Sequence, residues 1–259
     1  KNSEPKMGCK VEELGLDEAI SEHLKELEIK QFYKFQEESI QEITFGENVV
    51  IEAPTASGKT EAFLIPVLQR IKKDGTKGNV FAIFVYPTKA LARDQYPKIQ
   101  KFSEKIGIDV KVFDGDTKID ERRKIIDDPP QILITNFDVL HYHLWHQTKF
   151  SSILNSTKML IVDEAHVYSG IFGSNVHYII KRLKRICSNK LQFVAASATL
   201  DDAKEFCQKL FGGKMQIIYG SGKKGQTDFV MLFPSLRTQR ALMVELTKKL
   251  TQKNHKTMV

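Results

Sequence analysis

The sequence has few cysteines and no long apolar run, and both absences narrow the class of protein. Its three cysteines, Cys9, Cys187 and Cys207, lie far apart, which fits neither a disulfide framework nor the paired spacing of a zinc site. No apolar run reaches the roughly 18 residues that a membrane span needs, and the N-terminal KNSEPKMGCK lacks the apolar core of a signal peptide. We therefore expect a protein of the reducing cytoplasm with no membrane partner.

Metal ligands are also scarce. The stretch HYHLWHQ contains His141, His143 and His146, but on a helix His143 and His146 share a face that His141 does not. No carboxylate or cysteine nearby completes a ligand set. Trp145, the single tryptophan, is expected to pack within the fold rather than to stack on a base.

The composition is that of a globular chain with a basic surplus. With 259 residues, 41% hydrophobic and 27% charged, the chain can bury one full core and begin a second domain. A formal charge of +7 is common in nucleic-acid-binding proteins but also occurs in ordinary lysine-rich ones.

Short apolar runs alternate with longer segments of helical periodicity. Such runs are typical of strands covered on both faces, and the intervals are long enough for crossover helices. The pattern predicts an α/β fold with a mostly parallel sheet and helices on both faces. The predicted strands are 48–53, 79–86, 109–114, 131–135, 158–164, 191–197 and 215–219.

A segment rich in glycine and lysine, GSGKKGQTD at 220–228, separates this pattern from the C-terminal residues. After it, FVMLFP resembles another strand, and 236–250 another helix. We place a domain boundary here, with a first domain at 1–219, a linker at 220–227 and the beginning of a second domain at 228–259.

The first of these strands leads into a turn that suits phosphate binding. APTASGKT has the spacing of a phosphate-binding loop, with alanine in place of the first glycine. Backbone N–H groups there would converge on phosphates at a helix N-terminus, Lys59 would reach the β- and γ-phosphates, and Thr60 would ligate Mg²⁺. The alternative is a simple turn and helix start. The loop residues are Ala53, Pro54, Thr55, Ala56, Ser57, Gly58, Lys59 and Thr60.

An acidic pair supplies the second part of this chemistry. In KMLIVDEAHVYSG, four apolar residues end in Asp163 and Glu164, at the edge of a parallel sheet where ligands bind. Asp163 is expected to hold Mg²⁺, and Glu164 to orient or deprotonate the attacking water. Alone, such a pair is more typical of a helix cap; the phosphate loop favours the catalytic interpretation.

These motifs together resemble those of a known family. DEAH (163–166), ASATL (196–200), YPTKALARDQ (86–95) and TNFDVLH (135–141) resemble the first RecA-like motor domain of superfamily-two helicases. With FDGDTKIDERRKI (113–125) and DEAHVYSGIFGSNV (163–176), the chain most resembles the RecQ-four-related DExH DNA helicases of archaea, bacteria and fungi.

The resemblance implies further roles near the nucleotide. Gln36 lies where the family reads the adenine edge, for which an amide offers a donor and an acceptor, and Tyr33 is the candidate ring to stack on the base. A surface glutamine beside a core tyrosine is the alternative. His166 would couple the nucleotide site to Ser197, Ala198 and Thr199; a locally bonded histidine at a helix start is the alternative.

Nucleic acid is expected at loops that come after strands. Their N–H groups and short polar side chains can bind backbone phosphates without reading sequence, although Lys89 could also be an ordinary solvated lysine. The charged run ERRK (121–124) is expected to be a solvated helix face. The candidate residues are Thr88, Lys89, Ala90, Gly115, Asp116, Thr117, Thr135 and Asn136.

The resemblance therefore implies an ATP-dependent helicase that uses ATP and Mg²⁺ to move 3′ to 5′ on single-stranded or partly duplex nucleic acid, with DNA favoured. An RNA helicase, a duplex translocase and a non-catalytic binding module stay open, as does the oligomeric state. In the family an arginine finger comes from a second motor domain. No glycine-arginine pair occurs in this chain, so on its own it is expected to be inactive or nearly so.

Overall fold

The computed structural model describes residues 6–54, 57–188, 190–198, 202–221 and 238–253. The chain falls into two units, Lys1–Lys223 and Lys224–Val259. The second unit contributes α10 (Gln239–Gln252) to the described residues, close to the helix predicted at 236–250. The strand predicted at FVMLFP and most of the linker lie outside the described residues. The predicted domain limits therefore stay a prediction.

A seven-stranded parallel sheet forms the centre of the first unit, in the order β5-β6-β4-β7-β8-β3-β9. All seven predicted strands are present, so the predicted α/β fold is confirmed. The central strands are buried on both faces, which explains their continuous apolar sequences. The strands are β3 (Val49–Glu52), β4 (Ala82–Val85), β5 (Val110–Val112), β6 (Ile132–Thr135), β7 (Met159–Val162), β8 (Gln192–Ser197) and β9 (Gln216–Tyr219).

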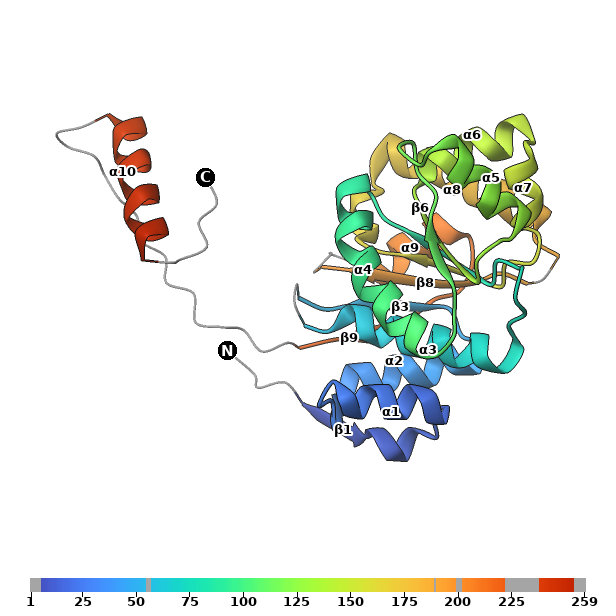
Figure 1. The fold of residues 1–259 in the computed structure, drawn as a ribbon, viewed down its shortest axis with the longest axis horizontal. Coiled ribbons are helices and arrows are strands. Elements are labelled where there is room, and N and C mark those ends of the chain that lie inside the picture. Colours follow the sequence, from blue (N-terminus) through green and yellow to red (C-terminus); the bar gives the residue numbers. More distant parts are fainter. Residues whose placement is uncertain (1–5, 55–56, 189, 199–201, 222–237, 254–259) are drawn as a thin grey trace. The chain divides into compact units, whose positions relative to one another are not determined.

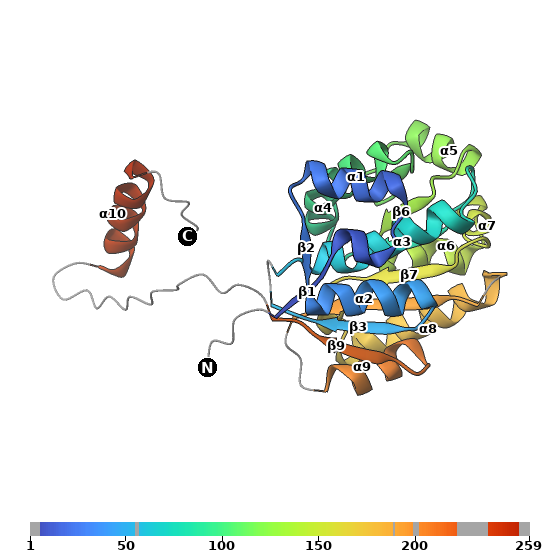
Figure 2. The ribbon, with the colours of Figure 1, turned by 90° about the horizontal axis from the view of Figure 1, so that it is seen from below.

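Helices cover both faces of this sheet (Figure 1). On one face they are α1 (Glu18–Glu26), α2 (Lys34–Phe45), α3 (Lys59–Asp74) and α4 (Lys89–Lys105). On the other they are α5 (Ile119–Asp127), α6 (Phe137–His146), α7 (Lys149–Ile153), α8 (Gly170–Ile186) and α9 (Ala203–Phe211). Figure 2 shows α2 and α9 on opposite sides of β3.

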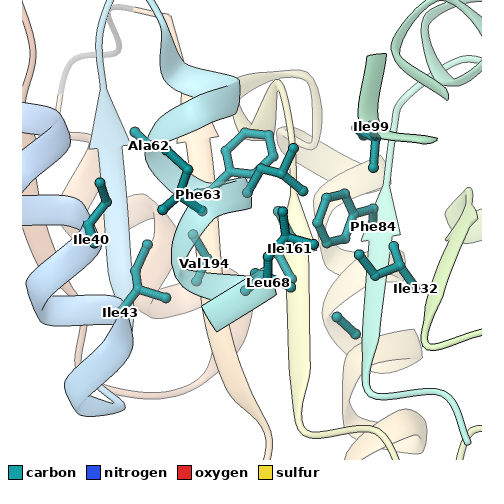
Figure 3. Close-up of a cluster of buried hydrophobic side chains, with 14 of the residues drawn as sticks. Ile40, Ile43, Ala62, Phe63, Leu68, Phe84, Ile99, Ile132, Ile161 and Val194 are labelled. Carbon is teal, nitrogen blue, oxygen red and sulfur yellow. The ribbon is translucent and has the colours of Figure 1, made fainter. Parts of the chain in front are cut away.

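Alternate strand residues supply two separate cores. Along β3, Val49 and Ile51 face the α1–α4 side, whereas Val50 faces the α5–α9 side, as the two-residue period of a strand requires. Helix α3 is buried along most of its length. Its Phe63 ring meets the Phe84 ring of β4 edge to face, 5.8 Å between centroids (Figure 3). This packing fixes the start of α3 against the sheet.

The sequence analysis missed a small antiparallel sheet of β1 (Met7–Lys10) and β2 (Gln31–Tyr33), with the short 3₁₀ helix η1 (Val11–Leu14) after β1. Its strands are three and four residues long and partly exposed, so their sequences carry little apolar alternation. The Glu37 carboxylate of α2 accepts a hydrogen bond from the Cys9 backbone N–H at 2.9 Å. This sheet therefore fixes the start of α2, where Tyr33 and Gln36 lie.

Candidate nucleotide and nucleic-acid sites

The candidate residues gather at one edge of the sheet because all seven strands are parallel. Strands β7, β8 and β3 adjoin one another in the strand order. The acidic pair follows β7, Ser197 is the last residue of β8, and the phosphate loop follows β3. The loops after β5, β6 and β4 continue the same edge and carry the predicted nucleic-acid residues. The fold thus divides this edge into two neighbouring regions.

The phosphate loop holds two buried polar groups that make no hydrogen bond within the described residues. Lys59 is the first residue of α3 and is 8% exposed. Its Nζ atom and the Oγ atom of Ser57 are buried and have no hydrogen-bond partner among the described residues. Unpaired buried polar groups are costly, so phosphate oxygens, which accept hydrogen bonds, fit this site.

Position 58 requires glycine for two reasons, its backbone conformation and the close approach of the Gln36 side chain. It precedes α3 in the left-handed conformation, with φ +91°, and a Cβ added there would lie 2.5 Å from Nε2 of Gln36. Ala53 is buried and Pro54 and Thr60 are partly buried at the two ends of the loop. Thr55 and Ala56 lie outside the described residues.

Asp163 is a buried carboxylate next to this loop. It is 8% exposed, and its Oδ1 accepts a hydrogen bond from the Glu164 backbone N–H at 2.8 Å. Its pKa is raised from 3.8 to about 6, chiefly by burial; the charge of Glu164 adds to the rise, whereas the hydrogen bond from the Glu164 N–H and the charge of Lys59 oppose it. Burial disfavours the charged form of this carboxylate, and a bound cation would offset that cost, so Asp163 suits a metal ligand.

Glu164 faces the lysine of the phosphate loop. It adopts the left-handed conformation, φ 48° and ψ 46°, just before the 3₁₀ helix η2 (Ala165–Val167). Its Oε1 lies 3.9 Å from Lys59 Nζ. The left-handed backbone is unusual for a residue with a side chain; here it turns the carboxylate toward the phosphate loop.

His166 connects Glu164 with the loop after β8. Its Nδ1 lies 3.3 Å from Glu164 Oε2 and 3.3 Å from Ser197 Oγ. One ring nitrogen therefore lies between the Glu164 carboxylate, which follows β7, and the hydroxyl of the last residue of β8. Ala198 comes next at the partly buried strand end, and Thr199 lies outside the described residues.

Two tyrosines near Asp163 were missed in the sequence analysis. The hydroxyls of Tyr86, after β4, and Tyr168, after η2, are buried and have no hydrogen-bond partner among the described residues. Burial, followed by the charge of Asp163, raises the pKa of both phenols. Tyr86 opens the YPTKALARDQ motif, the one sequence signal that could have identified it.

Gln36 is bound to the phosphate loop. It is 7% exposed; its Oε1 accepts from the Tyr33 backbone N–H at 2.9 Å, and its Nε2 donates to the Gly58 carbonyl at 3.0 Å. The alternative of a surface glutamine is therefore wrong. The Tyr33 ring stacks on Phe35, 6.3 Å between centroids. Gln36 therefore lies beside the loop, and the Tyr33 backbone is bonded to Gln36.

The loop after β4 presents exposed residues to solvent. Thr88 caps α4 by accepting a hydrogen bond from the Leu91 N–H, and Ala90 is exposed. Lys89 Nζ lies 2.7 Å from Asp116 Oδ1 in the loop after β5. A Cβ added to Gly115 would lie 2.8 Å from Lys89 Nζ. The two loops therefore meet, with a lysine over a glycine.

Other predicted nucleic-acid residues use their side chains within the fold. The Thr135 hydroxyl is buried and donates to the Phe113 carbonyl at 2.7 Å, and Asn136 caps α6 through the Val139 N–H. The Thr117 hydroxyl accepts from the Asp114 N–H at 2.9 Å. Their side chains thus shape the loops, which leaves backbone groups and the neighbouring Lys89 and Gly115 as the accessible part.

Two arginines that stiffen this region were not singled out from the sequence. Arg93 of α4 binds the buried Asp114 through Nε and Nη2, each at 3.1 Å. Arg122, within the run expected to be a solvated helix face, donates to the carbonyls of Thr117, Asp114 and Gly115. That expectation is wrong for Arg122, because its guanidinium supplies the donors that the loop carbonyls need.

The aromatic expectation for α6 is also wrong. Trp145 is 62% exposed, so it does not pack within the described fold.

The histidines of α6 make local contacts; the ring nitrogen Nδ1 of His143 lies 2.7 Å from the Thr148 hydroxyl. In the described part of the chain, no three histidine, cysteine or acidic side chains gather as a metal set, and no helix has the length and apolarity to span a membrane.

The parallel sheet, the loop around Lys59 and the adjoining acidic pair define a P-loop nucleotide-binding domain of the RecA-like kind. The family model described as DEAD/DEAH box helicase matches residues 33–206. The chain belongs to the DEAD/DEAH box helicase family.

Relatives place it within that family. The ATP-dependent helicase YprA of Bacillus subtilis is 36% identical in an alignment of 259 residues; the alignment covers 94% of this chain and 34% of the relative. The ATP-dependent helicase hrq1 of Schizosaccharomyces pombe is 34% identical over 217 residues, 80% of this chain and 20% of the relative. The predicted likeness to RecQ-four-related helicases is confirmed. The chain spans about a third or less of these relatives.

Solved structures agree with this placement. The DUF1998 helicase MrfA, in a crystal structure with DNA and AMPPNP, is 34% identical with a TM-score of 0.79, over 96% of this chain and 36% of that one. The helicase Mss116 shares 21% identity and a TM-score of 0.76 over 97% of this chain and 55% of that one, which shows the common RecA-like fold alone.

Proposed function

We propose that this chain is the ATP-binding motor domain of a DNA helicase that moves 3′ to 5′ along single strands with ATP and Mg²⁺. The observation that carries the proposal is the buried Lys59 ammonium, which has no hydrogen-bond partner among the described residues and lies 3.9 Å from Glu164 and close to the desolvated Asp163. The MrfA relative, crystallised with DNA and AMPPNP, supports the choice of ligands.

The phosphate loop would bind the nucleotide. Lys59 Nζ and Ser57 Oγ would donate to phosphate oxygens, and the N–H groups at the start of α3 would add their partial positive charge. Gln36 and Tyr33 would hold the adenine. Thr60 and Asp163 would hold Mg²⁺, which when bound neutralises charge on the transferred phosphoryl group.

Glu164 would orient and deprotonate the attacking water. Its carboxylate is held between Lys59 and His166, at 3.9 and 3.3 Å. His166 would pass changes at Glu164 to Ser197, because its Nδ1 is close enough to bond with either.

The loops after β4, β5 and β6 would bind the nucleic-acid backbone. Thr88, Lys89 and Ala90 lie exposed at the start of α4, where backbone N–H groups can donate hydrogen bonds to a phosphate without reading sequence. Lys89 is held by Asp116 at 2.7 Å, so a phosphate would compete with that carboxylate for the ammonium.

The test measures the ATPase rate and the duplex unwinding of the full-length protein. We expect ATPase stimulation by single-stranded DNA, and unwinding of a duplex with a 3′ tail in preference to one with a 5′ tail. Lys59→Ala should abolish both activities. Stronger stimulation by RNA than by DNA would overturn the substrate assignment. A preference for the 5′ tail would overturn the proposed polarity. Unchanged ATP turnover in Lys59→Ala would overturn the nucleotide site.

A further inference from the structure

The outer surface of α6 and α8 combines exposed aromatic and basic side chains. The two helices contact each other on the same face of the sheet (Figure 1). Trp145 and Tyr178 are 62% and 58% exposed. The residues of this α6–α8 basic surface are His141, Trp145, Tyr178, Lys181, Arg182 and Arg185.

Cations lie over the aromatic rings of this surface. The Arg182 guanidinium is 5.0 Å from the centroid of Trp145, and the Lys181 ammonium is 5.5 Å from that of Tyr178. Arg182 Nη1 also lies 3.3 Å from His141 Nδ1. Cation–π pairs of this kind orient a ring and keep a positive charge beside it.

Almost no negative charge balances these cations. Helix α8 contains four lysines and arginines and no acidic residue, and the one carboxylate of α6 is Asp138, in its first turn. Within the described residues, no carboxylate forms an ion pair with Lys181, Arg182 or Arg185. The surface therefore carries an uncompensated positive potential.

This surface is separate from the loops described above. Helix α6 begins after Asn136, and Trp145 lies nine residues farther along, about 14 Å at 1.5 Å per residue. Lys181 and Arg185 lie in the last two turns of α8, away from Glu164 and His166, which precede its start.

We propose that the α6–α8 basic surface is a second binding site for single-stranded nucleic acid, with phosphates at Lys181 and Arg185 and a base stacked on Trp145. Backbone charge combined with exposed aromatic rings is how sequence-neutral proteins bind single strands. The charge excess favours this occupant over an apolar protein surface. The site goes beyond the proposed helicase function, because it needs neither nucleotide nor the sheet-edge loops.

Trp145 is the single tryptophan of the chain, so its fluorescence reports on this surface directly. The experiment titrates the 259-residue chain with an oligothymidylate of about 12 nucleotides, within the usual site sizes, at several salt concentrations. Tryptophan is excited where tyrosine does not absorb. We expect saturable quenching that weakens as salt rises.

The double variant Lys181→Gln and Arg185→Gln should reduce the slope of log affinity against log salt, read from Trp145 quenching, by about 1.4, since each lost single-strand phosphate contact removes about 0.7. Both residues are exposed, so folding should be preserved, as circular dichroism would show. The matched control is Lys98→Gln with Lys101→Gln on α4, which covers the opposite face of the sheet.

Three outcomes would overturn the proposal. In the first, anisotropy of a labelled oligothymidylate shows binding while Trp145 emission stays unchanged. In the second, the α4 control variant loses as much slope as the α8 variant, which would indicate non-specific charge. In the third, polyglutamate of similar length quenches Trp145 equally well, which would indicate an acidic protein segment as the occupant.

Discussion

Replacing Asp163 by asparagine is expected to stabilise the nucleotide-free protein at neutral pH, although it removes a carboxylate that the proposed chemistry needs. The side chain is 8% exposed and burial raises its pKa from 3.8 to about 6. Asparagine has nearly the same shape, and its Oδ1 can still accept the hydrogen bond from the Glu164 N–H. The substitution therefore removes a buried charge and keeps its contact.

The magnitude is set by the pKa. A tenfold change in proton affinity corresponds to about 1.4 kcal/mol, so a rise from 3.8 to about 6 sets an upper value of about 3 kcal/mol on the cost of ionising Asp163. The folded-state pKa lies above the unfolded one, so stability is lost as pH rises from about 4 through 6. The free energy of unfolding of Asp163→Asn should therefore exceed that of the wild type by about 1 to 3 kcal/mol at about pH 8.

The assay is urea unfolding without nucleotide and with a metal chelator, followed by circular dichroism across this pH range. The control is Asp120→Asn, since Asp120 is 89% exposed and should change stability by less than about 0.5 kcal/mol. The difference between Asp163→Asn and wild type should shrink toward zero near pH 4. A variant less stable than wild type at pH 8, or a difference independent of pH, would refute the reasoning.

Three further predictions concern the proposed activity. Lys59→Ala should lose nucleotide binding in calorimetry with unchanged circular dichroism, because Lys59 Nζ makes no hydrogen bond among the described residues and only a 3.9 Å ion pair with Glu164; a collapsed spectrum would make it a structural residue. Glu164→Gln should still bind ATP but leave it unhydrolysed in a single-turnover assay, and loss of binding would contradict a role as base. Lys89→Ala should lower the salt dependence of single-stranded DNA binding by a slope of about 0.7 for all sequences, whereas Lys98→Ala, a lysine paired with Asp94, should not; equal effects would exclude a specific phosphate contact.

The strands could be predicted because each central strand is buried on both faces. Ile132–Thr135 and Met159–Val162 are buried at every position, and such runs are visible without any partner. The strand order was not predictable, because it depends on which strands pair across long crossovers. The sequence analysis also missed β1 and β2, whose short, partly exposed strands are stabilised by contacts such as Glu37 with Cys9.

At the candidate site, motif residues were predictable and their supporting residues were not. Lys59, Asp163 and Glu164 have a recognisable spacing. Arg122 lies within a run of charges, and only the folded loop shows that it binds three carbonyls. Trp145 is expected in a core by its residue type alone. Its exposure depends on which face of α6 meets the sheet, where Leu140 and Leu144 are buried.

The strand order brings the proposed nucleotide site next to the loops that are proposed to bind nucleic acid. Strand β7 lies between β8 and β4, so the loop that carries Asp163 adjoins the loop after each of them. Toward β8, His166 lies 3.3 Å from Ser197. Toward β4, the charge of Asp163 raises the pKa of Tyr86 after the larger effect of burial, and Tyr86 lies only two residues before Thr88. In the proposed function, a change of charge at Asp163 or Glu164 would therefore be felt at side chains already in place beside it, Tyr86 after β4 and, through His166, Ser197 at the end of β8.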